Sequence, residues 1–304
     1  MNAATRTQAA IYVHEPGWFA KQRWLLWQAL VNTHNDNGFG IAKGAAYSSL
    51  LSFFPVMTAT TTILVQSRAE EVSNQITQFV FEVVPPGSQK LVERFFAVRG
   101  NEPVYLLVLA VLLAIWAASG AMMSLIEGFN AAYHVPRGRG PVRERLMAAL
   151  LVLCVTLPGV GASALILSGQ RAEAAVLSAI GLYGTGTDLA PWIVMLGKAL
   201  RFLLAFGASI LSTGLLYYLG PNRRVRMRTV WPGAFVAAVL WMLVTGGFSW
   251  YVRNIANYNV LYGSIAAVIA LLVWMYLLSI IAFVGCEFNV ARERLRQAGN
   301  VALD

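Results

Sequence analysis

Charged side chains are scarce in this chain. Only 12% of its 304 residues are Asp, Glu, Lys or Arg, whereas a soluble domain carries about 25%. Hydrophobic residues make up 58%, and the mean hydropathy is +0.60. This composition argues against a disordered chain, a soluble enzyme and a hydrated nucleic-acid-binding domain. It indicates a membrane protein whose spans are helices, because lipid offers no hydrogen-bond partners to an open backbone.

Cysteine and histidine are also rare, which removes several kinds of site. The two cysteines, Cys154 and Cys286, lie in or at the end of apolar segments without a CxxC spacing, so a disulfide framework is not expected. The three histidines are scattered, with no HxxxH or HExxH, which disfavours the common zinc-site patterns. GxSxG and the Walker A pattern are absent as well. We therefore expect no metal, no cofactor and no enzymatic activity.

Long apolar segments, by contrast, are spread over most of the chain. Crossing a hydrocarbon core about 30 Å thick takes about 20 apolar residues in a helix. Six segments have this length, near 43–66, 104–126, 146–169, 192–219, 231–251 and 262–285. The sequence therefore predicts an all-α fold, a polytopic membrane bundle of about six transmembrane helices.

Basic residues are distributed unevenly among the connections of these segments. The N-terminal region to Lys43, the second-to-third and fourth-to-fifth connections and the tail hold 15 Lys and Arg, whereas the remaining connections hold six. Because basic loops stay in the cytoplasm, both termini are predicted to be cytoplasmic. The net charge of +9 then reflects topology, and nucleic acid is not expected as a partner.

Amphipathic segments flank the first span. Within a cytoplasmic region over 1–42, a polar stripe at helical spacing and many aromatic residues predict an interfacial helix over 17–35. The outer loop 67–103 has apolar residues at spacings of three and four around a Pro-Pro-Gly break, which predicts a helical hairpin. We thus divide the chain into the region 1–42, a membrane domain over 43–289 that includes the hairpin, and a cytoplasmic tail over 290–304.

The first span carries small and hydroxyl-bearing residues along one side. Gly44, Ser48, Ser52 and Pro55 fall on one arc of a helix. Such a face packs closely against another helix, or it lines a pathway with a helix interruption at Pro55. Both interpretations stay open for this face and for four further candidate residues, Tyr47, Tyr262, Gly263 and Ser264.

Ionisable residues near the ends of the spans are further candidates, because charge at membrane depth is costly. Lys198 and Arg201, near the outer end of the fourth span, share a helix face and could meet an anion, or their long side chains could reach the outer head groups. A cytoplasmic polar cluster is also expected, which is either hydrated and paired with loop arginines or handles a proton or cation. Its members are Glu127, Asn130, Glu287 and Asn289.

Several blocks of the sequence resemble the YihY/virulence factor BrkB family, once labelled ribonuclease BN. They are Gly44–Pro55, the Trp-Pro-Gly-Ala of 231–234, Tyr258–Ser264 and Gly285–Asn289, where Phe288 replaces the family's usual Leu. The blocks occur in family order and span about residues 40–290. The resemblance implies a bacterial inner-membrane protein with about six helices, and it supplies no catalytic residue.

Two functions fit these features. The first is a transporter or flippase-like protein for an anionic lipid or amphiphile, supported by the hydroxyl face of the first span and by Lys198 and Arg201. The second is a non-transporting membrane scaffold or envelope-integrity factor, in which the small-residue faces only pack. Ribonuclease activity is disfavoured, since no His/Asp cluster is present. Membrane lipids are the expected partners, and a homo-oligomer or an envelope partner remains open.

The charge distribution yields a test of topology. Cysteine placed singly at Thr5 or Ala302 is expected to react with a membrane-impermeant maleimide only when the cytoplasmic face is opened, because both positions lie on the side with 15 basic residues. Reaction of either position from the periplasmic face of intact cells contradicts the model.

Overall fold

The computed structural model describes residues 17–66, 104–136, 140–179, 191–254 and 265–301. These ranges form seven helices and contain no strand. The helices are α2 (Trp18–Asn35), α3 (Gly38–Gln66), α6 (Val104–Ala132), α7 (Pro141–Ala179), α8 (Pro191–Leu219), α9 (Met227–Asn254) and α11 (Ala266–Val301). The all-α fold predicted from composition is therefore confirmed.

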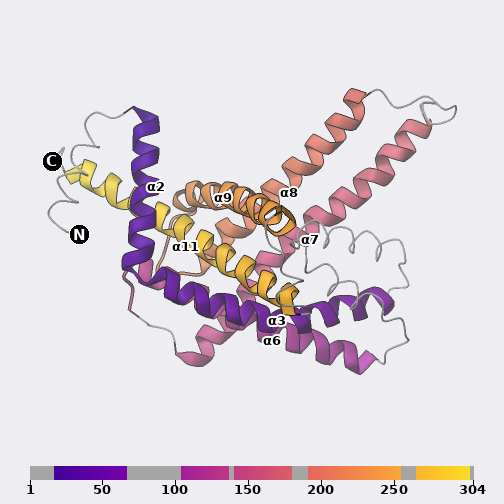
Figure 1. The fold of residues 1–304 in the computed structure, drawn as a ribbon, viewed down its shortest axis with the longest axis horizontal. Helices are drawn as coiled ribbons and strands as arrows, with labels where there is room; N and C mark the ends of the chain where they lie inside the picture. The colour runs from indigo at the N-terminus through magenta and orange to yellow at the C-terminus, as the bar shows by residue number, and fades with distance from the viewer. Residues whose placement is uncertain (1–16, 67–103, 137–139, 180–190, 255–264, 302–304) are drawn as a thin grey trace.

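The helices pack as neighbouring pairs around α11. Figure 1 shows α3 running alongside α6, and α7 and α8 extending together away from the other helices. α9 and α11 lie together near the centre, and α2 crosses α11 near the end of the molecule where α3 begins. α11 also contacts α3 and α6, so it contacts four of the other helices, α2, α3, α6 and α9.

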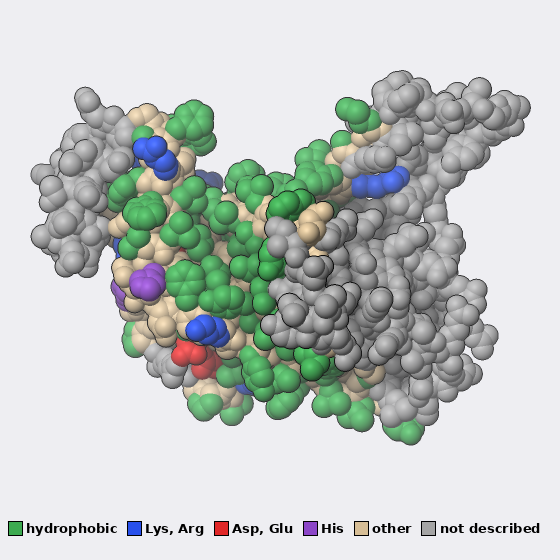
Figure 2. Space-filling view, viewed as in Figure 1, with side chains coloured by type: hydrophobic (Ala, Val, Ile, Leu, Met, Phe, Trp, Pro, Cys, Tyr) green, Lys and Arg blue, Asp and Glu red, His purple; other side chains and the backbone are tan. Residues whose placement is uncertain are grey.

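Five helices of the described part are long and apolar enough to cross a membrane. Their apolar stretches are Val108–Ala132, Pro141–Ala162, Ala199–Leu219, Met227–Val252 and Ala266–Ala298. These correspond to the last five predicted spans, and α3 corresponds to the first. Hydrophobic side chains cover most of the described surface on the face in Figure 2. This is the exterior expected of a polytopic helical protein surrounded by lipid.

Three sequence-based expectations can be compared with these bounds. The interfacial helix expected over 17–35 is α2, which begins at Trp18 and ends at Asn35. The helix break that one interpretation places at Pro55 is absent, because α3 continues through this residue as one helix, and a kink there stays a prediction. A proline removes one N–H donor and bends a helix without ending it when packing holds both sides. The outer hairpin 67–103 lies outside the described residues.

The contact between α9 and α11 is made by backbone. A Cβ at Gly233 would collide with the carbonyl of Gly285, and a Cβ at Gly285 would collide with the Tyr217 hydroxyl and lie 2.8 Å from the Gly233 carbonyl. The missing side chains therefore let the two helices touch. The Tyr217 hydroxyl, from α8, donates to the Ala282 carbonyl at 2.7 Å and ties a third helix to the same place.

Asn289 holds the beginning of α9 against α11. Its Oδ1 accepts a hydrogen bond from the Gly233 N–H at 2.8 Å, and its Nδ2 donates to the Val230 carbonyl at 3.0 Å. Pro232, between these two residues, cannot donate a hydrogen bond itself. The side chain is buried, so both of its polar ends are satisfied where water is excluded.

We expect Gly285→Ala to lower the free energy of unfolding by about 1–3 kcal/mol, because the added methyl group overfills the α8–α9–α11 contact. The matched control is Gly246→Ala on α9, where a Cβ meets no heavy atom within 4 Å. That variant is expected to be neutral or more stable by up to about 1 kcal/mol, since alanine favours a helix. Unfolding in detergent measures both. Equal stability of the two variants contradicts the close contact.

Candidate functional site

The small face of α3 packs against α6. A Cβ at Gly44 would lie 3.8 Å from the Ser124 hydroxyl, and one at Gly120 would lie 3.7 Å from the Ser48 Cβ. Ser52 is buried, and its hydroxyl donates to the carbonyl of Ser49 at 2.8 Å. At these positions small residues of α3 and α6 lie against each other, which allows the two helices to pack closely.

The remaining candidates for the pathway or packing face lie away from this helix contact or outside the described residues. Tyr47 is 60% exposed and does not belong to the packed face. Pro55 is half-buried in α3. Tyr262, Gly263 and Ser264 lie outside the described residues, so their role as a pathway or packing face stays a prediction.

The four residues of the expected cytoplasmic polar cluster do not form one site. Asn130 is buried, and its Oδ1 accepts a hydrogen bond from the Asn222 N–H at 2.7 Å. Asn289 holds α9, as described above, whereas Glu287 faces α2. Glu127 is exposed. Residues that are close along a helix point in different directions around it, and each buried one here serves a different neighbouring helix or turn.

Charged contacts tie the connections after α6 and α8 to α11. Arg223 forms an ion pair with Glu293, with Nη2 2.5 Å from Oε1, and its guanidinium lies 4.5 Å from the centre of the Tyr133 ring. Arg294 donates to the Ala132 carbonyl at 3.3 Å. Burial raises the pKa of the Tyr133 phenol well above its usual value, so this ring stays neutral. The connection after α6 and that after α8 therefore meet on the end of α11.

Lys198 and Arg201 lie at the beginning of the membrane-crossing part of α8. The helix itself begins at Pro191, but its apolar stretch is Ala199–Leu219. Both alternatives for these two residues, an anion partner and the outer head groups, stay predictions.

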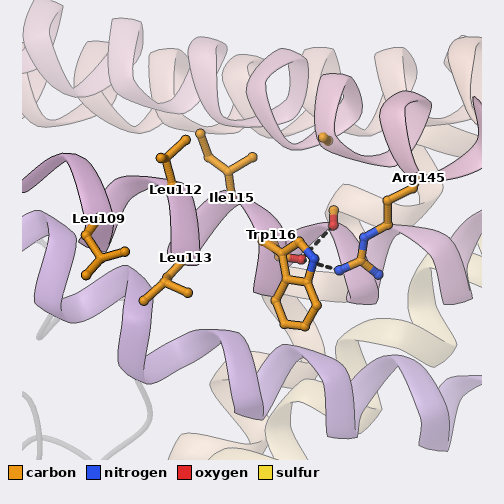
Figure 3. Close-up of a pocket in the computed structure, with 8 residues that line it drawn as sticks. Leu109, Leu112, Leu113, Ile115, Trp116 and Arg145 are labelled. Atoms are coloured by element: carbon orange, nitrogen blue, oxygen red, sulfur yellow. Dashed lines mark hydrogen bonds between the residues drawn. The ribbon is translucent and has the colours of Figure 1, made fainter. Parts of the chain in front are cut away.

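An apolar groove lies between α6 and α7. Its volume is about 570 Å³, within the range of about 300–1,000 Å³ that ligand pockets occupy. Leucines of α6 form most of its wall, and Arg145 of α7 lies at one end (Figure 3). The complete lining is Leu109, Leu112, Leu113, Ile115, Trp116, Ser119, Arg145 and Ala149.

Arg145 contacts α6 inside its membrane-crossing stretch. The guanidinium Nη2 donates to the Trp116 carbonyl at 2.7 Å, Nη1 lies 3.3 Å from the Met123 sulfur, and Cζ lies 4.8 Å from the centre of the Trp116 ring. Trp116 and Met123 both lie within the apolar stretch Val108–Ala132 of α6, and Arg145 lies near the beginning of the apolar stretch Pro141–Ala162 of α7. The guanidinium therefore lies against a membrane-crossing stretch of α6.

The groove combines an apolar wall with a hydrogen-bond donor at one end. A guanidinium has five N–H donors in a plane, and the two contacts with Trp116 and Met123 use two of them. The Trp116 side chain is 66% exposed, so the groove opens to the outside of the bundle.

Sequence analysis missed Arg145 because it assigned this residue to a cytoplasmic connection. Its predicted third span begins at 146, whereas α7 begins at Pro141 and already contacts α6 at Arg145. The available signal was the run of apolar residues that starts directly after Arg145. Among the described residues, no group of three or more His, Cys, Asp or Glu could hold a metal ion.

Comparison with known proteins gives relatives over most of the chain. A ribonuclease-like protein, YfkH, of Bacillus subtilis is 29% identical over 85% of this chain and 92% of its own length. A UPF0761 membrane protein of Pseudoalteromonas translucida is 26% identical over 96% of this chain and 95% of its own. A UPF0761 membrane protein of Alkalilimnicola ehrlichii is 29% identical over 86% of this chain, which spans 58% of that protein.

No solved structure matches the chain. The family model described as virulence factor BrkB matches residues 29–303, which include every resembling block and all of the helices from α3 onward. Two of those blocks, 231–234 and 285–289, meet in space at the contact between α9 and α11. The chain is a membrane protein of the virulence factor BrkB family.

Proposed function

We propose that this protein is a transporter or flippase-like protein of the bacterial inner membrane that handles an anionic lipid or amphiphile. The observation that carries the proposal is the groove between α6 and α7, in which a guanidinium lies against a membrane-crossing stretch of α6 beside a leucine-lined surface. Ionisable residues in membrane-crossing segments are rare, and they commonly mark a substrate path.

The groove suits an anionic amphiphile better than a neutral one. A phosphate or carboxylate can accept two parallel hydrogen bonds from one arginine, which are about twice as strong as those between neutral groups. The ring of Trp116, stacked against the guanidinium, fixes the direction of its donors. An acyl chain beside Leu109 and Leu113 remains in contact with apolar groups throughout.

The orientation of the protein is part of this proposal. The ends of α6, α8 and α11 and the beginnings of α7 and α9 carry the basic connections, and contacts between them gather at one end of the bundle. We assign this end to the cytoplasm on the positive-inside rule. Since the sequence has no Walker A segment, movement of a lipid would follow its own gradient or draw on another source of energy.

A scaffold is the second candidate function, and the packing of α3 on α6 favours it. Gly44 and Ser48, two candidates for the pathway or packing face, lie beside Ser124 and Gly120 of α6, which supports the packing interpretation. A scaffold would need no groove occupant, and Arg145 would then serve only to hold α7 against α6.

Lipid binding and transfer test the proposal with a matched pair of variants. Arg145→Gln is expected to weaken binding of phosphatidylglycerol by about 10- to 150-fold, since one charge-assisted hydrogen bond contributes roughly 1.5–3 kcal/mol. Arg143→Gln, which removes an exposed charge two residues away, is expected to bind as the unaltered protein does. Native mass spectrometry with phosphatidylglycerol and phosphatidylcholine measures both, and little change is expected with the neutral lipid.

The same proteins in liposomes separate the two functions. The unaltered protein is expected to speed the exchange of fluorescent phosphatidylglycerol between leaflets, and Arg145→Gln to slow that exchange. Exchange no faster than in protein-free liposomes favours the scaffold. Purified protein incubated with RNA tests the activity that the name of the Bacillus subtilis relative suggests. Degradation that survives purification to homogeneity would overturn the non-enzymatic part of the proposal.

A further inference from the structure

The helix α2 exposes its large apolar side chains and half-buries several of its polar ones. Exposed residues recur along it at spacings of four, four, three and four, and they form what we call the outer stripe: Phe19, Arg23, Trp27, Leu30 and His34. At 100° per residue these positions fall within an arc of about 80°. The Phe19 side chain is 80% exposed and that of Trp27 is 65% exposed. An apolar surface thus replaces the polar one that an exposed helix normally presents to water.

The outer stripe points away from the contact that α2 makes with α11. The buried residues of α2 are Leu25, Ala29 and Thr33, at spacings of four. The middle of this buried set and the middle of the outer stripe are about 120° apart around the helix. α11 supplies the other side of the seam with Val284, Phe288, Ala291 and Leu295. Packing among the described residues therefore leaves the outer stripe exposed.

α2 lies at the end of the membrane-crossing helices and across their direction. The α11 residues of the seam all belong to the apolar stretch Ala266–Ala298 of that helix. Figure 1 shows α2 crosswise to α3, and α3 runs alongside the membrane-crossing helix α6. A helix that crosses such spans at their end lies along the surface of the bilayer.

A short turn fixes this direction of α2. Only Asp36 and Asn37 separate α2 from α3. The Asp36 N–H donates to the Asn32 carbonyl at 2.8 Å, and the Asn37 N–H donates to the His34 carbonyl at 3.2 Å. Asn37 has a φ of 57°, in the left-handed region that ends many helices. The outer stripe is therefore held close to the beginning of α3.

The residue types of the outer stripe are those of a helix that lies in a lipid surface. Exposed apolar patches mark contacts with protein or membrane. Tryptophan is enriched where hydrocarbon meets water, because its ring is apolar and its N–H is polar. Arg23 lies between Phe19 and Trp27 along the stripe, where its stem can follow the apolar surface and its guanidinium can reach a phosphate group. Because α2 packs on membrane-crossing helices, the nearest surface for this stripe is the bilayer itself.

We propose that the outer stripe of α2 inserts into the leaflet at which α3 begins, and that Arg23 binds the anionic head groups of that leaflet. The partner is an anionic lipid surface. This contact is separate from the α6–α7 groove, and a transporter and a scaffold would both use it, so it goes beyond the proposed function. Loss of one basic residue weakens association with an anionic surface about fivefold.

Spin labels on α2 test the insertion in liposomes at a low ratio of protein to lipid. The label is attached to Leu30→Cys in a chain that also carries Cys154→Ala and Cys286→Ala. It is expected to collide with dissolved oxygen more than with a water-soluble nickel chelate, since lipid dissolves oxygen and excludes the chelate. The control Asn35→Cys, on the polar side of α2, is expected to show the reverse. A label at position 30 that the chelate reaches more than oxygen, or that a second copy of the chain shields from both, overturns the proposal.

Hydrogen exchange of the chain with its own cysteines tests the head-group contact. Protection of α2 is expected to be higher in nanodiscs that contain phosphatidylglycerol than in phosphatidylcholine alone. Arg23→Gln is expected to lower that protection about fivefold in phosphatidylglycerol and to change it little in phosphatidylcholine. The matched control Lys21→Gln removes a charge from the polar side of α2 and is expected to behave as the unaltered chain does.

Equal protection of α2 in the two lipids, or an equal effect of the two replacements, overturns the proposal. Lipid exchange by Arg145→Gln does not depend on these results, because Arg145 lies on α7. Failure of the α2 proposal therefore leaves the proposed function testable by itself.

Discussion

The backbone contact between Gly233 and Gly285 is the constraint on which the packing of α8, α9 and α11 depends. Any side chain at either position would separate α9 from α11. With the two helices touching, Tyr217 reaches the Ala282 carbonyl and Asn289 reaches both polar groups at the beginning of α9. Membrane helices gain little from burying apolar surface away from lipid, so close packing and buried hydrogen bonds have to hold them together.

This contact also sets the positions of the neighbouring helices. Phe283 of α11 packs directly against Gly128 of α6, and the ring of Phe129 meets those of Tyr217 and Phe283 edge to face. α11 thus presents one side to α9, another to α6 and a third to α2. Glu287 lies on the side toward α2 and is buried there.

Helix positions could be predicted from the sequence, because hydropathy and span length depend on local composition. α2 began and ended within one residue of its prediction, and each predicted span corresponds to one helix. The roles of individual polar residues could not be predicted in the same way. Glu127, Asn130 and Asn289 share an end of the bundle but face different neighbours, since direction around a helix depends on packing. Arg145 was assigned to a loop because its contact with Trp116 is not visible in the sequence. The two residues are 29 apart, and only the packing of α7 on α6 brings the guanidinium to the Trp116 carbonyl.

The central claim is that the groove beside Arg145 holds an anionic amphiphile within the membrane. A cryo-electron microscopy structure in nanodiscs containing phosphatidylglycerol tests this most directly. The account predicts elongated density along Leu109, Leu112 and Leu113, ending in a head group bonded to the Arg145 guanidinium. A guanidinium directed to the aqueous interface, with no ordered lipid against these leucines, would contradict it.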